Sequence, residues 1–173
     1  MNADAQMGGR VMKVNHAGEQ GAICIYTGQI FMARFTAKSL LAELLVFKAH
    51  EVGHRAIFHR ELERRGLRRC RSYWLCAAGG YVLGIGTGLF GAKAISLTTL
   101  AVERVVLRHL RQQIAFLAND VAAVSAISAI LNEEQEHHDR AAIRESAGGV
   151  FGRLFISMVS CATETVIWLG MRL

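Results

Sequence analysis

The stretches EVGH at residues 51–54 and EQEH at residues 134–137 decide the fold of this chain. Each places a glutamate and a histidine three positions apart, so that the two side chains lie on one face of an α-helix. Each pair also follows a further glutamate at nearly the same distance, since Glu19 lies 32 residues before the first pair and Glu103 lies 31 residues before the second. The spacing therefore predicts a unit that occurs twice, with two helices in each copy.

Turns are expected midway between the glutamates of each copy. Residues at the same level of two antiparallel helices are equidistant from the connecting turn, and the two midpoints fall at Phe35 and at residues 118–119. Ser39 and Asp120 follow these midpoints and are of the type that caps helices at their N-terminal ends. We therefore expect two antiparallel hairpins in which the glutamates of each copy face one another.

The helical faces that carry these acids are apolar, because leucine, isoleucine, valine and phenylalanine recur around them at helical spacing. Buried carboxylates without partners are strongly unfavourable, and two divalent cations would balance four of them. A glutamate from each of two helices, with a Glu-x-x-His pair from each of the other two, is the ligand set of ferritin-like di-iron bundles. Oxygen-rich ligation with one imidazole per metal favours iron or manganese over structural zinc. The predicted ligands are Glu19, Glu51, His54, Glu103, Glu134 and His137.

Helical signals cover nearly the whole chain. The sequence contains no proline, and alanine, leucine, arginine, glutamate and glutamine are plentiful, which favours helices. We expect a single all-α domain over residues 1–173, built as a ferritin-like four-helix bundle with two additional apolar helical segments and a flexible N-terminus over residues 1–13. The expected helices span residues 15–35, 39–65, 72–92, 94–117, 120–145 and 150–171.

The two additional segments, residues 72–92 and 150–171, are expected to dock on a membrane. The chain is 52% hydrophobic, and six arginines between Arg60 and Arg71 precede the first segment. Basic residues followed by aromatic and then apolar residues are typical of an anionic membrane surface, although a solvated basic helix end gives the same pattern. Within the first segment, glycines at four-residue spacing would allow a second helix to approach closely; they are Gly80, Gly84 and Gly88.

Several segments together resemble the demethoxyubiquinone hydroxylases, the membrane-associated di-iron monooxygenases of coenzyme Q biosynthesis. The resemblance covers nearly the whole chain and rests on VNHAGE at residues 14–19, IYTGQ at 25–29, Glu51 with His54, AVE at 101–103, EEQEHHD at 133–139 and IWL at 167–169. It implies a division of the ligands between two irons, with Glu19 and His54 for one, Glu103 and His137 for the other, and Glu51 and Glu134 as bridges.

The same resemblance implies the reaction and its reactants. The ring of 2-polyprenyl-3-methyl-6-methoxy-1,4-benzoquinol would be hydroxylated with dioxygen in ubiquinone biosynthesis, with NADH as the ultimate reductant. A polyprenyl tail partitions into the bilayer, so we expect the protein at the cytoplasmic face of the inner (cell) membrane, or at the matrix face if it is mitochondrial. Other ubiquinone-biosynthesis proteins and a second copy of the chain are partners that the sequence leaves open. Nucleic acid is not expected, because no stacking aromatic residues are interleaved with the arginines.

Departures from the family pattern and rival functions are left open. Leu110 stands where the family commonly has a tyrosine after His109, and the prolines often found after the arginine-rich stretch are absent. Tyr26 and His109 are candidates to support the site from outside the ligand set, although an ordinary packed or solvated role is commoner for such residues. A ferritin-like iron oxidase or store, or a catalytically idle membrane-bound lipid-binding homologue, would carry the same pattern. The remaining histidines that flank the motifs are not expected to be ligands; they are His16, His50, His59 and His138.

Overall fold

The computed structural model describes residues 3–144 and 149–173, which are almost entirely helical and include no strand. This confirms the expected all-α class. The α-helices are α1 (Ala3–Thr36), α2 (Leu41–Arg64), α3 (Tyr73–Leu89), α4 (Ala92–Phe116), α5 (Val121–Ser128), α6 (Leu131–Arg144) and α7 (Val150–Gly170), and a short 3₁₀ helix, η1 (Lys38–Leu40), joins α1 to α2.

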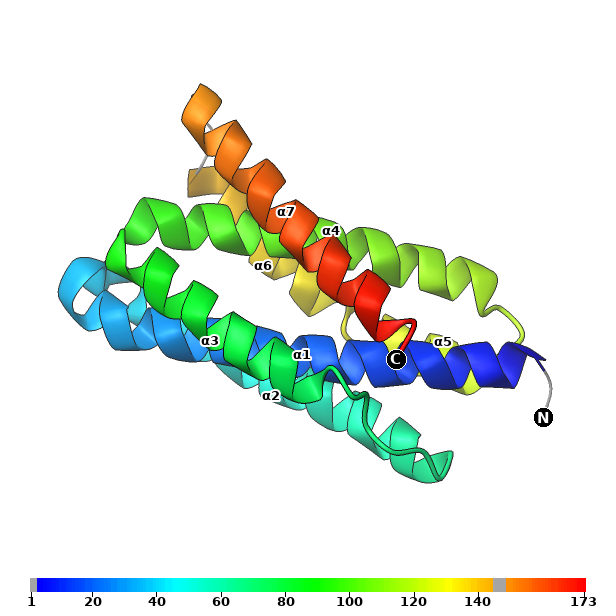
Figure 1. The fold of residues 1–173 in the computed structure, drawn as a ribbon. Helices are drawn as coiled ribbons and strands as arrows, with labels where there is room; N and C mark the ends of the chain where they lie inside the picture. The colour runs from blue at the N-terminus through cyan, green and yellow to red at the C-terminus, as the bar shows by residue number, and fades with distance from the viewer. Residues whose placement is uncertain (1–2, 145–148) are drawn as a thin grey trace.

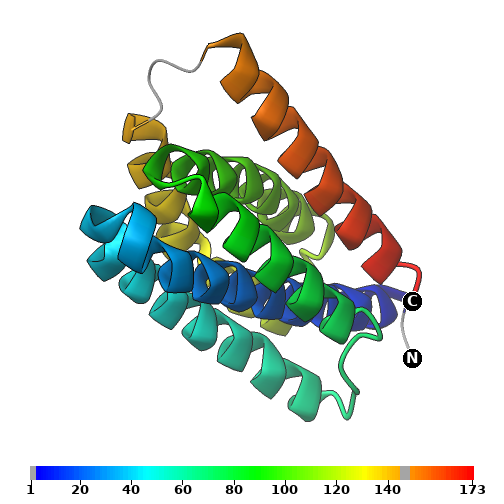
Figure 2. The same ribbon diagram turned by 60° about the vertical axis from the view of Figure 1, so that its left-hand side comes forward.

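The helices form two antiparallel hairpins that pack side by side (Figures 1 and 2). α2 runs back along α1, and α5 followed by α6 runs back along α4, so both predicted hairpins are present. α3 lies along the outside of α1, and α7 crosses the outside of α4. Each hairpin therefore carries one further helix, and both further helices lie on the same side of the bundle (Figure 1).

The described part of the N-terminal segment, where we expect a flexible N-terminus over residues 1–13, is helical. The first two of these residues lie outside the described ones, and the rest form the first turns of α1. Val11 and Met12 are fully buried and belong to the apolar core, which gives this segment a reason to stay folded. Gly8 packs closely against Asp120, whose side-chain oxygen would have to move to make room for a Cβ at this position.

The helix expected over residues 120–145 is in fact two helices over its described part, with residue 145 outside that part. Asp120 caps α5 as predicted, since its side chain accepts a hydrogen bond from the N–H of Ala123 at 3.2 Å. α5 then ends, and the N–H of Ile130 bonds to the carbonyl of Ile127 at 3.3 Å, which makes a tight turn before α6. Both isoleucines stay fully buried, so the interruption does not disturb the apolar face.

The two ends of α2 were predicted with different success. Gly66 lies just beyond the C-terminal end of α2 with a φ of 64°, a left-handed conformation that glycine adopts without strain. The prediction for this end is therefore confirmed. Ser39 is not the cap of α2, because it lies inside η1, and α2 begins at Leu41 without a side-chain hydrogen bond at its cap.

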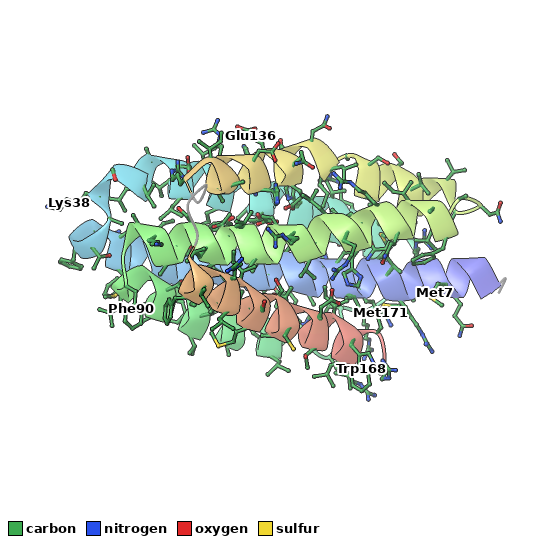
Figure 3. The ribbon with its side chains drawn as sticks, turned by 90° about the horizontal axis from the view of Figure 1, so that it is seen from above. Met7, Lys38, Phe90, Glu136, Trp168 and Met171 are labelled. Atoms are coloured by element: carbon green, nitrogen blue, oxygen red, sulfur yellow. The ribbon has the colours of Figure 1, made fainter. Side chains whose placement is uncertain are left out.

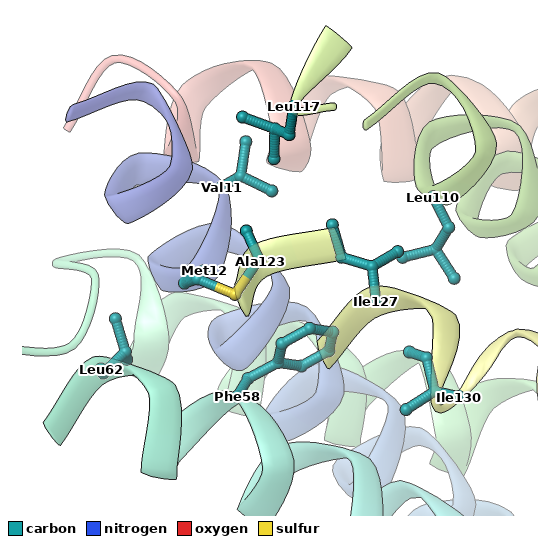
Figure 4. Packing of buried hydrophobic residues seen from close by; sticks show 9 residues of the cluster. All are labelled: Val11, Met12, Phe58, Leu62, Leu110, Leu117, Ala123, Ile127 and Ile130. Atoms are coloured by element: carbon teal, nitrogen blue, oxygen red, sulfur yellow. The ribbon is translucent and has the colours of Figure 1, made fainter. Parts of the chain in front are cut away.

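Two apolar clusters fill the interior of the bundle, one toward each end. The first, drawn in Figure 4, consists of Val11, Met12, Phe58, Leu62, Leu110, Leu117, Ala123, Ile127 and Ile130. The second consists of Tyr26, Ile30, Ala33, Ala37, Leu40, Leu44, Phe47 and Ile95. On α1, α2 and α4, the residues between the two clusters include the predicted ligands, so these acids lie in the middle of the bundle with apolar side chains on both sides.

The glycines of α3 allow its backbone to touch that of α1. A Cβ at Gly84 would overlap the carbonyl oxygen of Ile25, and a Cβ at Gly80 would overlap the carbonyl oxygen of Gly21. The close approach that the glycine spacing predicted is therefore confirmed, and α1 is the partner helix. With this face of α3 used in packing, the opposite face is left with exposed apolar side chains, which are Trp74, Leu75, Tyr81, Val82 and Leu89.

α7 is a long apolar helix on the outside of the bundle. It is the one helix there that is long and apolar enough to cross a membrane, by length and composition alone, and little of it is buried inside the bundle. Its exposed apolar residues include Phe151, Leu154, Met158 and Trp168. Figure 3 shows Trp168 on α7 and Phe90 after α3 at the outer edge of the molecule.

Replacing Gly84 with alanine should destabilise the protein by about 1–3 kcal/mol, because the added methyl group must push α3 away from α1. Gly86→Ala is the matched control on the same helix, since nothing lies within 4 Å of a Cβ at Gly86. Alanine there should be neutral or stabilise by about 0.5–1 kcal/mol through helix propensity. Urea unfolding of detergent-solubilised protein, followed by circular dichroism, measures both. Equal stability of the two variants would contradict the close α1–α3 packing.

Candidate metal centre

Four helices bring together the six residues that the sequence predicts as ligands. α1 contributes one glutamate, α4 contributes another, and α2 and α6 each contribute a Glu-x-x-His pair. None of these side chains belongs to a residue more than 5% exposed. We call this group the acid–histidine cluster; it consists of Glu19, Glu51, His54, Glu103, Glu134 and His137.

The cluster divides into two overlapping sets of four donors. In each set, one possible ligand atom from every residue lies within 4.8 Å of those from the others. Glu51 and Glu134 belong to both sets, whereas each histidine belongs to one. The sets are Glu19, Glu51, His54 and Glu134, and Glu51, Glu103, Glu134 and His137.

His54 presents its Nδ1 atom to the acids of the first set. This atom lies 2.9 Å from Glu134 Oε1, 3.6 Å from Glu51 Oε2 and 3.8 Å from Glu19 Oε2. The other ring nitrogen, Nε2, points away from the cluster and lies 2.6 Å from Glu133 Oε2. The imidazole thus joins the buried acids to a carboxylate outside them.

His137 has the same orientation in the second set. Its Nδ1 atom lies 3.3 Å from Glu51 Oε1, 3.9 Å from Glu134 Oε2 and 4.0 Å from Glu103 Oε1. Its Nε2 atom lies 3.0 Å from Nδ1 of His50. Both histidines therefore turn Nδ1 inward and Nε2 outward.

The inward atoms lack hydrogen bonds. Nδ1 of His54, Nδ1 of His137 and Oε1 of Glu51 are buried and, although they lie close to one another and to Glu134, form no well-aligned hydrogen bond with the described residues. An unsatisfied buried polar atom costs about 1–3 kcal/mol, and a metal ion would use these lone pairs. Carboxylate oxygens with one imidazole per set are donors that suit iron or manganese. The residues present therefore fit a pair of such ions.

Electrostatics show how unfavourable the cluster is without cations. Burial, reinforced by the neighbouring carboxylates of Glu51 and Glu134, raises the pKa of both Glu19 and Glu103 well above the usual value. Burial acts against a charged His54, yet contacts with Glu134 and Glu51 outweigh it and raise its pKa to about 10. For Glu51, burial is likewise outweighed, and its two histidine contacts lower the pKa. Without metal ions, the raised pKa values of Glu19 and Glu103 favour protonation of these two carboxyl groups, which reduces the repulsion within the cluster.

Tyr26 lies against the cluster, whereas His109 does not. The buried hydroxyl of Tyr26 donates a hydrogen bond to Glu103 Oε1 at 3.3 Å. His109 is partly exposed, and its Nε2 lies 2.8 Å from Glu164 Oε2 on α7. Its described contacts therefore connect α4 to α7 and do not include the acids. Leu110, at the position where a tyrosine is common in the family, packs in the first apolar cluster.

Sequence reasoning missed two residues that contact the outward nitrogens. Spacing does not single out His50 among the histidines, and Glu133 stands only as part of the EEQEHHD motif. A signal for both was present, because each stands immediately before one of the two Glu-x-x-His pairs. Their partners could not be inferred from spacing, since each contacts the histidine of the other helix.

Fold and site together define the class of this protein. It is an all-helical protein with a buried cluster of four carboxylates and two imidazoles, suited to hold metal ions between two hairpins. The model of the ubiquinone biosynthesis protein COQ7 family matches residues 6–170. The chain belongs to this family.

Curated relatives carry related names. A protein of Rhodospirillum rubrum named 3-demethoxyubiquinol 3-hydroxylase is 35% identical over 75% of this chain and 61% of the relative. A protein of Dictyostelium discoideum named NADPH-dependent 3-demethoxyubiquinone 3-hydroxylase, mitochondrial, is 28% identical over 94% of this chain and 76% of the relative. The mitochondrial 5-demethoxyubiquinone hydroxylase of Saccharomyces cerevisiae is 28% identical over 99% of this chain and 81% of the relative. The chain thus spans about three fifths to four fifths of these relatives.

The metal-free protein should lose stability as pH rises from about 7 to about 10. The raised pKa values of Glu19 and Glu103 mean that the protons which stabilise the folded state are lost as pH rises through those values. His54 acts in the same direction, because its contribution is complete below 6.5 and is lost through its folded pKa of about 10. Glu51, with a lowered pKa, contributes equally across this range.

Urea unfolding of the metal-free protein at both pH values would measure this loss, which should exceed about 1.4 kcal/mol, the equivalent of one pKa unit. In the double variant Glu19→Gln, Glu103→Gln the loss should be smaller, because neither amide titrates. Stability that rises with pH over this range would contradict the assignment of buried protons to the cluster.

Proposed function

We propose that this chain hydroxylates the ring of 2-polyprenyl-3-methyl-6-methoxy-1,4-benzoquinol, that is, demethoxyubiquinol, in ubiquinone biosynthesis. One atom of dioxygen enters the ring and the other leaves as water, which requires two electrons and two protons from a reductant. The observation that carries the proposal is the pair of four-donor sets that share Glu51 and Glu134, in a chain of the COQ7 family. Two related proteins are named for the same demethoxyubiquinone chemistry.

The proposed cofactor is a pair of iron ions within a ferritin-like bundle that forms one domain. Glu19 and His54 would hold one ion and Glu103 and His137 the other, with the two shared glutamates between them. When bound, reduced iron supplies the electrons and open coordination positions that dioxygen activation requires. The four carboxylates balance the charge of two divalent ions, which is why burial of these acids is tolerable.

The residues around the cluster would orient its ligands and keep it dry. Tyr26 holds the Glu103 carboxylate through its hydroxyl hydrogen bond, and the apolar clusters at both ends of the bundle exclude water. A narrow hollow between α1 and α4 reaches Tyr26 and Glu103 and is otherwise lined by Ala22, Ile25, Thr98, Thr99 and Val102. With a volume of about 10 Å³ it is too small for a quinol ring, so α1 and α4 would have to separate there before a substrate could approach Glu103.

The proposed source of electrons is a reduced nicotinamide cofactor. The Dictyostelium relative is named NADPH-dependent, which supports this class of reductant. NADH remains our prediction for this chain.

Membrane docking is proposed for the side of the bundle that carries α3 and α7. Both helices expose apolar side chains there. Arginines lie over aromatic rings near the ends of these helices, with the guanidinium of Arg69 4.9 Å from the Trp74 ring and that of Arg172 3.6 Å from the Trp168 ring. Such pairs suit a membrane–water interface. The cytoplasmic face of the inner membrane, or the matrix face in a mitochondrion, is the proposed location, and partner proteins and self-association remain predictions.

This exposed apolar surface favours the hydroxylase over an iron store. A storage protein needs no lipid-facing side. An idle homologue is disfavoured by the intact set of donors.

Glu134→Ala should abolish metal loading and turnover together, because Glu134 belongs to both donor sets. Wild-type protein should hold about two iron ions per chain, and the variant fewer than one. Metal analysis of purified protein and a hydroxylation assay with a short-tailed quinol measure the two effects. Glu136→Ala on the same helix is the control, since Glu136 is exposed and pairs with Arg140. Full activity of Glu134→Ala would rule out the proposed centre.

Loss of the gene should leave the demethoxy precursor unconverted. Quinones extracted from cells that lack the gene should contain demethoxyubiquinone in place of ubiquinone, and a plasmid copy of the wild-type gene should reverse this. A plasmid copy carrying Glu134→Ala should not. Normal ubiquinone in the deletion strain would refute the proposed substrate, while leaving the metal centre to be judged by metal analysis.

A further inference from the structure

Both histidines of the acid–histidine cluster contact a second residue through the outward ring nitrogen. His54 Nε2 lies 2.6 Å from Glu133 Oε2, and His137 Nε2 lies 3.0 Å from His50 Nδ1. The pairing is crossed, because Glu133 lies on α6 with His137 but contacts His54. His50 lies on α2 with His54 but contacts His137. Each copy of the repeated unit therefore supports the histidine of the other.

With a metal bound, these outer contacts would favour the tautomer in which Nε2 of each ring carries the proton. A nitrogen that binds a metal must offer a lone pair, so Nδ1 of His54 or His137 can serve only when the proton is on Nε2. An Nε2–H group then needs an acceptor. The carboxylate of Glu133 accepts without a tautomer requirement, whereas Nδ1 of His50 accepts when the proton of His50 is on its own Nε2.

The two acceptors differ in charge, which makes the two halves of the cluster unequal. A hydrogen bond to an ionised acceptor is roughly twice as strong as one between neutral groups, and it makes the histidine a better donor to a metal. His54 has such a carboxylate partner. His137 has the imidazole of His50, whose ring is tilted by only 9° from its own, with ring centres 5.3 Å apart.

We propose that His50 is a positioning residue that keeps Nδ1 of His137 available to the cluster, and that an imidazole in place of a carboxylate as outer partner makes the metal position beside Glu103 and His137 the weaker of the two. The position beside Glu19 and His54 is the tighter one, because Glu133 supports it. This inference rests on the proposed metal centre and adds an order of loading and a role for a residue outside the ligand set.

Titration of the metal-free protein with Co²⁺ in detergent, without dioxygen, tests the inference by cobalt absorption and calorimetry rather than by activity. Wild-type protein should bind in two steps of unequal affinity. His50→Ala should weaken the second step by about tenfold to a hundredfold and leave the first unchanged, a range typical for the loss of a ligand's outer hydrogen-bond partner. Circular dichroism checks that the variant keeps its helices.

Rescue variants separate positioning from packing. Asparagine places its amide oxygen near the position of a histidine Nδ1, so His50→Asn should restore the second step. His50→Asp offers a carboxylate and should strengthen that step beyond wild type. Glu133→Gln gives His54 a neutral acceptor, so it should weaken the first step and make the two more alike. His59→Ala on α2 and Glu136→Gln on α6 are matched controls at exposed positions, and both should leave the titration unchanged.

Distinct results would overturn the inference and the metal centre. If both cobalt-binding steps of His50→Ala had the same affinities as in the wild type, the role of His50 would be refuted. Equal weakening of both steps, without recovery in His50→Asn, would mean that His50 acts through packing, which also refutes it. Wild-type protein that binds no cobalt would refute the proposed metal centre itself, before any His50 variant is considered.

Discussion

The constraint on which this structure depends is the burial of four carboxylates in the middle of a helical bundle. Such a group is tolerable only if opposite charge accompanies it, and the chain supplies protons in the metal-free state, as the raised pKa values of Glu19 and Glu103 indicate. Apolar clusters on both sides keep water from relieving the repulsion. The helices must therefore position the acids accurately, because His54 alone, with a pKa raised to about 10 by Glu134 and Glu51, would not balance four ionised carboxylates.

Much of the fold follows from spacing alone. Two Glu-x-x-His pairs with a glutamate ahead of each fix the helical period and the positions of the turns, and the structure has both hairpins and brings the six residues together. The first turns of α1 were not predicted, because Val11 and Met12 stand among polar and glycine residues in the sequence. Their burial depends on helices that are distant in sequence. The break between α5 and α6 was not predicted, because apolar residues continue at helical spacing across it.

The residues around the cluster were harder to predict than the cluster itself. Tyr26 and His109 looked equivalent as candidates, but only Tyr26 lies on a helical face turned toward the acids, while His109 faces α7. The contacts of His50 and Glu133 cross between hairpins, so they depend on how one hairpin is rotated against the other. Spacing along one helix carries no information on that rotation. A sequence pattern thus predicts the ligand residues more readily than it predicts the residues that contact those ligands from outside.

The added helices extend the repeat to three helices in each half of the chain. α3 follows one hairpin and packs on α1, and α7 follows the other and packs on α4. Leu83 of α3 and Ile156 of α7 both pack on the buried group that contains Val102 of α4. Val102 and Ile25 also line the hollow that reaches Glu103. The repeat thereby brings apolar side chains from both halves of the chain to the place where the acids come near the surface of α1 and α4.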